Sequence, residues 1–143
     1  MSDEAPALVD TNVLVYAGDH LSPNHEASRR LRDSADGSRL CIAPQVILEY
    51  VATVTNPKRV ARASGVADAW ADAETFLSAF RLIVPERDHL SRVVAFAKTL
   101  EIGRAHVYDL ALAVTMLDAG VTTIYTYDDT VFSKVPGITV KTP

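Results

Sequence analysis

The sequence predicts a single α/β domain, in which a central parallel β-sheet of four to five strands is flanked by helices on both faces as an α/β/α sandwich. Short runs of β-branched and aromatic residues alternate with helical periodicity, which is the pattern of βαβ units joined by right-handed crossovers. The 143 residues contain no internal repeat, low-complexity tract or linker. We therefore expect residues 1–143 to form one domain.

The first expected strand covers residues 7–10, and the apolar pattern after it predicts a short helix that ends near Gly18. A turn at residues 22–24 follows. A second helix is expected after this turn because apolar residues recur there at four-residue spacing. These residues are Ala27, Leu31 and Ala35.

A second strand is expected over residues 39–43, followed by a helix that begins at Pro44, because proline is tolerated at the first helical position. Pro57 ends this helix. Its predicted apolar side is Val46, Ile47, Tyr50, Val51 and Val54, and its polar side is Gln45, Glu49 and Asn56. Cys41 lies in the apolar run of the strand, which favours a buried structural thiol and fits a reducing cytosol.

The middle of the chain predicts two further amphipathic helices on either side of a strand at residues 82–84. The first helix is expected to turn five residues inward, namely Val66, Trp70, Ala73, Leu77 and Phe80. The second is expected to be capped by Asp88. Its predicted inward residues are Leu90, Val94, Ala97 and Leu100.

The last third of the sequence begins with a predicted helix over residues 107–119 that is apolar nearly all round. Such a helix is expected to lie buried between the sheet and another layer. A fourth strand over residues 122–127 and an edge strand over residues 138–140 complete the predicted sheet.

Acidic residues stand at comparable junctions far apart in the sequence. Asp10 follows the first strand, Asp128 and Asp129 follow the fourth, Glu49 lies on the polar side of its helix, and Asp109 opens the apolar helix. Each alone has an ordinary explanation as a helix cap, a surface acid, a first-turn acid or a turn residue. Together they predict a divalent-metal site, because carboxylates gathered at strand ends need a cation or a shared proton. Oxygen ligands favour Mg²⁺ or Mn²⁺.

The residues around these acids resemble the PIN-domain ribonucleases, and within them the VapC-type toxins of bacterial toxin–antitoxin pairs. The resemblance covers almost the whole chain, through an opening motif at residues 9–16, Glu49, a third motif at 108–113, and a closing motif at 126–128 with 132 and 135–137. Between Asp128 and Phe132 this chain carries one residue more than the usual pattern of the family. This leaves open whether Asp128 or Asp129 is the fourth acid. Asp128 is favoured.

This resemblance implies metal-dependent hydrolysis of RNA phosphodiester bonds, with Mg²⁺ or Mn²⁺ as cofactor, by a toxin that inhibits translation. The products would carry 5′-phosphate and 3′-hydroxyl ends. Asp10 would be the central metal ligand, Asp109 and Asp128 flanking ligands, and Glu49 a ligand or a base that orients water. Asn12 and Thr126 would orient the carboxylates. A homodimer and a small antitoxin partner are also implied.

Other candidate residues have two interpretations each. Lys58, Arg59, Arg62 and, more weakly, Arg104 are either guides for RNA phosphates or solvated surface residues. His106 lies close enough in sequence to Asp109 to touch a phosphate or a metal, although a surface position is expected for all four histidines. Tyr16 and Trp70 are expected to be core or interface aromatics rather than base-stacking platforms.

Composition narrows the possible functions further. A net charge of −4 gives no broad basic surface of the kind that marks a duplex-binding module. Residues 1–6 lack the features of a secretory signal, and no apolar run approaches a membrane span, so a cytoplasmic protein is expected. Two alternatives to the nuclease are a catalytically degenerate PIN-like binding module and a haloacid-dehalogenase-like phosphatase. The phosphatase needs an acid two residues after Asp10, where this chain has Asn12.

Overall fold

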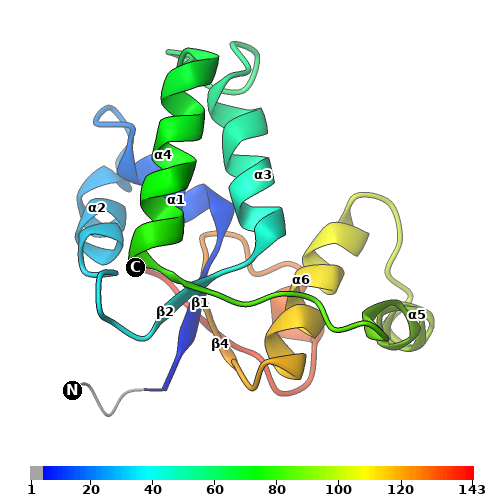
Figure 1. Cartoon of the computed structure of the whole chain (residues 1–143). Helices are drawn as coiled ribbons and strands as arrows, with labels where there is room; N and C mark the ends of the chain where they lie inside the picture. The colour runs from blue at the N-terminus through cyan, green and yellow to red at the C-terminus, as the bar shows by residue number, and fades with distance from the viewer. Residues whose placement is uncertain (1–4) are drawn as a thin grey trace.

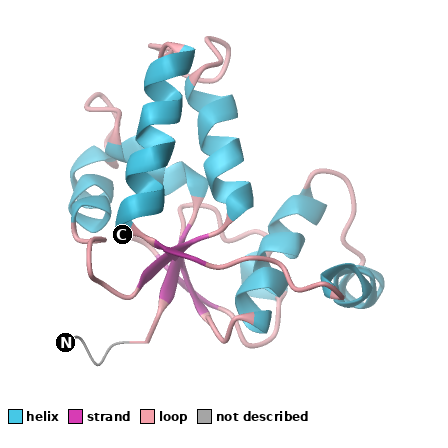
Figure 2. Ribbon diagram, viewed as in Figure 1, coloured by secondary structure: helices cyan, strands magenta, loops and turns pink. Residues whose placement is uncertain are grey.

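The computed structural model describes residues 5–143, which form one sheet flanked by helices (Figures 1 and 2). In chain order the elements are β1 (Ala7–Val9), α1 (Thr11–Ala17), α2 (His25–Asp33), β2 (Leu40–Ile42), α3 (Pro44–Val54), α4 (Val66–Ala79), β3 (Arg81–Leu82), α5 (His89–Leu100), α6 (His106–Asp118), β4 (Thr123–Tyr125), a 3₁₀ turn (Phe132–Lys134) and β5 (Thr139–Lys141). Every strand and helix that the sequence predicts is present, with ends shifted by a few residues.

The sheet has the strand order β3-β2-β1-β4-β5, and all four pairings are parallel. The central strand β1 pairs with β2 through Ala7 and Leu40, and with β4 through Ala7 and Thr123. The predicted fold class is therefore confirmed. The chain winds outward on one side of β1 and then crosses to its other side, so a topological switch point lies between the ends of β1 and β4.

The helices divide into two groups according to this winding. Helices α1 to α4 lie together on one side of the sheet, and α5 and α6 lie together on the other (Figure 1). This division follows from right-handed crossovers that change direction at β1. Helix α6 packs against α5 and buries a run of residues from Leu112 to Met116 together with Leu110, as its apolar sequence predicts.

The core begins with the strands themselves. All three residues of β1 and of β2 are buried, because a parallel sheet covered on both faces has no solvent side. Cys41 belongs to this layer as a buried free cysteine, which confirms the predicted structural thiol. The predicted apolar side of α3 is also buried.

The predicted inward face of the α4 segment is confirmed for Ala73 and Phe80 and wrong for the other three residues. Trp70 is 46% exposed, and Val66 and Leu77 are exposed as well. Ala69 and Phe76, which the sequence did not predict to face inward, are buried beside Ala73 and Phe80. The small side chains of Ala69 and Ala73 let the helix backbone approach the core closely, whereas the bulkier Trp70 stays at the surface.

Helix α5 and the start of α2 differ from the sequence prediction in the same way. Leu90 and Val94 are exposed, whereas His89 is only 9% exposed, so a surface position is wrong for this histidine. The Asp88 side chain makes no capping hydrogen bond and instead pairs with Arg92 at 2.7 Å. In α2 the predicted inward Ala27 is exposed, while the neighbouring Ser28 is buried. Its hydroxyl lies 2.8 Å from the Tyr127 hydroxyl.

Within residues 5–143, no helix has the length and apolar character that crossing a membrane requires. The expectation about a missing secretory signal rests mainly on residues 1–4, which lie outside the described residues.

Candidate active site

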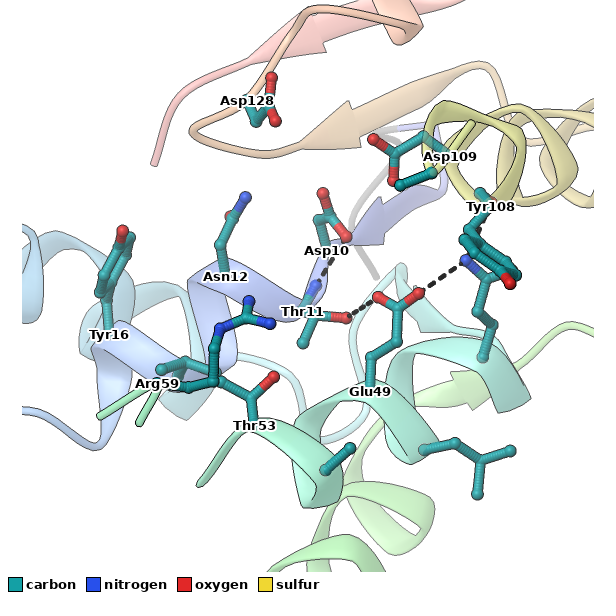
Figure 3. Close-up of a pocket in the computed structure, with 15 residues that line it drawn as sticks. Asp10, Thr11, Asn12, Tyr16, Glu49, Thr53, Arg59, Tyr108, Asp109 and Asp128 are labelled. Atoms are coloured by element: carbon teal, nitrogen blue, oxygen red, sulfur yellow. Dashed lines mark hydrogen bonds between the residues drawn. The ribbon is translucent and has the colours of Figure 1, made fainter. Parts of the chain in front are cut away.

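A pocket of about 900 Å³ opens at the carboxyl ends of the strands. Its lining comes from α1, α3, the start of α6 and the loop after β4, and includes Asp10, Glu49, Asp109 and Asp128 (Figure 3). These four acids come from four separate segments of the chain. The pocket lies at the switch point of the sheet, where open α/β folds bind their ligands.

Asp10 occupies the deepest position among these acids, because it directly follows the central strand. Its N–H donates to the Tyr125 carbonyl oxygen at 3.0 Å and continues the pairing of β1 with β4. Oδ1 accepts from the Thr11 N–H at 2.7 Å, which makes Asp10 the N-cap of α1. The capping role that the sequence offered as an alternative is thus real, and it also fixes the carboxylate at the pocket.

Thr126 holds the second oxygen of Asp10. Its hydroxyl donates to Asp10 Oδ2 at 2.8 Å and accepts from the Asn12 amide at 3.0 Å and from the Asp128 N–H at 3.1 Å. One hydroxyl has one proton and two lone pairs, so these three bonds use its full capacity. Thr126 therefore links the β1–α1 junction, which carries Asp10 and Asn12, to the loop after β4, which carries Asp128.

Asn12 connects α1 to the strand end that carries Thr126. Its amide donates to Thr126, and its carbonyl oxygen accepts from the Tyr127 N–H at 3.2 Å. Asn12 thus reaches Asp10 only through Thr126. The Asn12 amide group makes hydrogen bonds to Thr126 and Tyr127. It does not supply the general acid that a haloacid-dehalogenase-like phosphatase needs at this position.

Glu49 is oriented by two donors from different helices. Thr11 donates its hydroxyl to Oε2 at 3.0 Å, and Gln45 donates its amide to Oε1 at 2.9 Å. The same Gln45 amide donates to the Tyr108 carbonyl oxygen at 2.9 Å. Gln45 therefore ties α3 to the start of α6 beside Asp109.

Burial and mutual repulsion raise the pKa of two of the acids. The pKa of Asp10 is raised to about 6, mainly by burial and further by the charges of Glu49 and Asp128, against the hydrogen bonds from Thr126 and Thr11. The pKa of Asp109 is raised to about 7, mainly by burial and then by the charges of Asp10, Glu49 and Asp128. These effects show that the four carboxylates share one electrostatic environment.

The two adjacent acids after β4 occupy different places. Asp128 lines the pocket, and its Oδ1 accepts from the Thr130 hydroxyl at 2.7 Å and from the Thr130 N–H at 3.1 Å. These bonds lower the pKa of Asp128. Asp129 does not line the pocket, and its carbonyl oxygen accepts from the Ser133 N–H in the following turn. The structure thus brings Asp128, and not Asp129, to the other acids.

The negative charge of the pocket is uncompensated. Within residues 5–143, none of the four lining acids forms an ion pair with an arginine or lysine. An all-oxygen donor set with excess negative charge fits Mg²⁺ or Mn²⁺. In the same described range, however, no three His, Cys, Asp or Glu side chains stand together closely enough to hold a metal ion.

The four basic candidates are separated by the structure. Arg59, in the loop between α3 and α4, lines the pocket, and Figure 3 shows its guanidinium turned toward the α1 side. Lys58, Arg62 and Arg104 are exposed and lie outside the pocket lining. His106 is exposed too, although its charge lowers the pKa of Asp128.

The pocket lining also includes residues that the sequence did not assign to the site, among them Thr11, Gln45, Tyr16 and Tyr108. Gln45 had a usable signal, because it precedes Glu49 by one helical turn. Tyr16 is partly buried at the pocket wall rather than in the core. Its ring meets Tyr127 edge-on, with 5.4 Å between ring centroids.

Comparison with known families gives a clear result, because the PIN domain family profile matches residues 7–138. The chain belongs to the PIN domain family. The resemblance recognised in the sequence is therefore confirmed. This PIN domain is 29% identical over 115 residues to ribonuclease VapC24 of Mycobacterium tuberculosis, and the match covers 79% of each chain.

Solved structures show the same fold. VapC20 of Mycobacterium tuberculosis, described as a sarcin-ricin loop cleaving toxin, matches with a TM-score of 0.68 at 15% identity, covering 90% of this chain and 94% of that one. VapBC2 from Rickettsia felis, bound to a promoter DNA fragment, matches with a TM-score of 0.66 at 18% identity, covering 95% and 97%. PIN-domain nucleases generally use divalent metal ions, which agrees with the acidic lining of this PIN domain's pocket.

Proposed function

We propose that this PIN domain is a metal-dependent endoribonuclease and the toxin of a VapBC-type pair, which inhibits translation by hydrolysing RNA. One observation carries the proposal. Four acids from separate segments line one pocket at the switch point, with no basic partner in the described part of the chain. Membership of the family and similarity to a ribonuclease support it.

Asp10, Asp109 and Asp128 would hold the cation, with Glu49 as a further ligand or as the base that orients the attacking water. When bound, Mg²⁺ or Mn²⁺ supplies charge stabilisation at the scissile phosphate and lowers the pKa of a bound water. Thr126 and Asn12 fix the orientation of Asp10, and Thr11 and Gln45 fix that of Glu49. Arg59 would contact an RNA phosphate beside the acids.

The deciding experiment compares RNA cleavage on a gel with Mg²⁺, with Mn²⁺ and with a chelator. Cleavage is expected only with metal, and Asp10→Asn should abolish it while the far-UV circular dichroism stays unchanged. Glu26→Gln is the matched control, because Glu26 lies on the exposed face of α2, and this variant should cut like the wild type. Cleavage in chelator, or equal cleavage by Asp10→Asn, would refute the proposal.

A catalytically degenerate binding module is the second candidate, and the spread of the acids favours it, since no three of them stand at metal-binding distance in the described residues. Calorimetric titration of the protein with Mg²⁺ and Mn²⁺ separates the two. The nuclease requires heat of binding that disappears in Asp10→Asn. A degenerate module gives no heat of metal binding in the wild type or in Asp10→Asn, and it cuts no RNA.

The assembly of the protein is also part of the proposal. By likeness to VapBC-type pairs, we expect a homodimer and a small antitoxin that blocks the acidic pocket. Light scattering at high protein concentration tests the dimer, and a monomer there would contradict it. The protein product of the gene adjacent to this one is the first antitoxin to test, by inhibition of the cleavage assay.

A further inference from the structure

Two tyrosines line opposite ends of the acidic pocket. Tyr16 lies near the end of α1, and Tyr108 lies in the first turn of α6, directly before Asp109. Figure 3 shows Asp10 and Glu49 between the two rings. The acids are thus flanked by an aromatic side chain on each side.

Neither ring is fully used by the fold. Tyr108 is 62% exposed, so its ring is open to a ligand that enters the pocket. Neither tyrosine hydroxyl makes a hydrogen bond within residues 5–143. Tyr16 is held in place by its edge-on contact with Tyr127, whose hydroxyl lies 2.8 Å from that of the buried Ser28. The Tyr16 ring is therefore held in position, and the exposed Tyr108 ring is open to contact.

The charges of the pocket make such contacts necessary for a nucleic acid. Arg59 is the one cationic side chain in the described lining, against four acids, and the whole chain carries a net charge of −4. Neutralisation of backbone phosphates is the usual source of affinity for nucleic acids, and it is weak here. Stacking of bases on aromatic rings supplies affinity that needs no positive charge.

We propose that Tyr16 and Tyr108 each stack a base, one on either side of the bond that is cut, so that the pocket takes single-stranded RNA. This inference rests on the proposed ribonuclease function. Stacking on both rings requires bases that are splayed out of a helix, as in loops and single strands. Duplex RNA keeps its bases paired and cannot reach both rings.

Steady-state cleavage of a single-stranded oligoribonucleotide tests the roles of the rings. Tyr108→Leu removes the ring but keeps apolar bulk, and should raise KM about 5- to 100-fold. Its kcat should stay within about 2-fold, because the acids are unchanged. Tyr108→Phe keeps the ring and should match the wild type. Trp70→Leu is the matched control, since Trp70 is exposed on α4 outside the pocket.

A binding measurement keeps this inference separate from the cleavage proposal. A 2-aminopurine base beside the cut site should lose fluorescence on binding to the wild type or to Asp10→Asn, and should lose less with Tyr108→Leu or Tyr16→Leu. Thermal melting of Tyr16→Leu shows whether loss of the ring contact with Tyr127 destabilises the fold. Tyr16→Phe keeps that ring contact and serves as the control. Unchanged KM and unchanged quenching in both leucine variants, or equal binding of a duplex, would overturn the inference. Quenching without any cleavage would support it while contradicting the nuclease.

Discussion

Acids on the outer face of α2 and acids in the pocket behave in opposite ways. Glu26 and Asp33 lie in water and pair with Arg29 at 2.7 and 3.0 Å, and the bond to Arg29 lowers the pKa of Glu26. Among residues 5–143, Asp10 and Asp109 form no ion pair with a basic side chain, and burial raises their pKa to about 6 and about 7. The same side-chain chemistry is thus neutralised in one region and left uncompensated in the other.

The two groups of acids affect the stability of the folded chain differently. Exposed pairs such as those of α2 contribute little stability each. A buried carboxylate without a partner destabilises the folded chain. Such groups are typical of binding and catalytic sites, so the contrast between the two regions supports the pocket as the candidate site.

The largest effect is expected from the two adjacent acids after β4. Asp128→Asn should reduce kcat/KM for RNA by about 100-fold or more, because it removes a charged pocket oxygen that would hold the metal. Its Oδ1 can still accept from Thr130, so the loop should remain folded. Asp129→Asn should change kcat/KM less than about 2-fold. The reverse result would place the fourth acid at Asp129.

Thr126→Val should have the next largest effect, since it removes the hydroxyl that donates to Asp10 and accepts from Asn12 and Asp128. Loss of a group that orients a metal ligand typically costs about 10- to 100-fold in metal affinity or activity. Thr126→Ser keeps the hydroxyl and should lose far less. Calorimetric titration measures the metal affinity of both variants, and a cleavage assay measures their activity. Equal activity of Thr126→Val and Thr126→Ser would contradict the positioning role of Thr126.

Asp109→Asn should stabilise the metal-free protein at high pH. The folded pKa of about 7 exceeds the ordinary value of 3.8, so folding takes up a proton and stability falls as pH rises between about 4 and 7. The asparagine side chain carries no charge. The melting temperature of Asp109→Asn should therefore exceed that of the wild type by on the order of 5 °C at pH 8. The gain should vanish near pH 4.

Added Mg²⁺ should make the wild type melt at a higher temperature than Asp109→Asn. The ion stabilises the folded wild type by mass action, and it should stabilise the variant less. An unchanged melting temperature in metal-free Asp109→Asn at pH 8 would show that the pocket charges are compensated in some other way.

The smallest effect is expected on the α2 surface. Arg29→Met removes the ion pairs with Glu26 and Asp33 and should lower the free energy of unfolding by less than about 1 kcal/mol. Urea unfolding measures this, and cleavage should be unchanged. A loss of activity in this variant would break the contrast between the two regions.

The sequence predicted the elements of this fold well, but not which face of each outer helix is buried. The strands β1 and β2 and helix α6 were readable because they are apolar on nearly every side. In α4, apolar residues occupy two adjacent stripes, so the periodicity fits either Trp70 or Phe76 as the inward side. Only packing against the other helices decides between them, through contacts such as that of Phe76 with Tyr50.

The pocket was partly predictable for a related reason. Acids at strand ends must converge in a parallel sheet, so the approach of Asp10 and Asp128 follows from topology alone. The supporting bonds do not, because Thr11 reaches Glu49 across 38 residues and Gln45 reaches Tyr108 across 63. The distance between the acids is also set by side-chain geometry that no spacing in the sequence reveals.

The bond between Thr126 and Asp10 spans 116 residues, and this span has a consequence during synthesis. A nascent chain on the ribosome exposes β1 long before β4 has been made, and β4 must then insert beside a strand that is already folding. Until that insertion, Asp10 lacks both the hydroxyl that orients it and the neighbouring carboxylate of Asp128. The proposed nuclease site would therefore be assembled only after the last third of the chain has been synthesised.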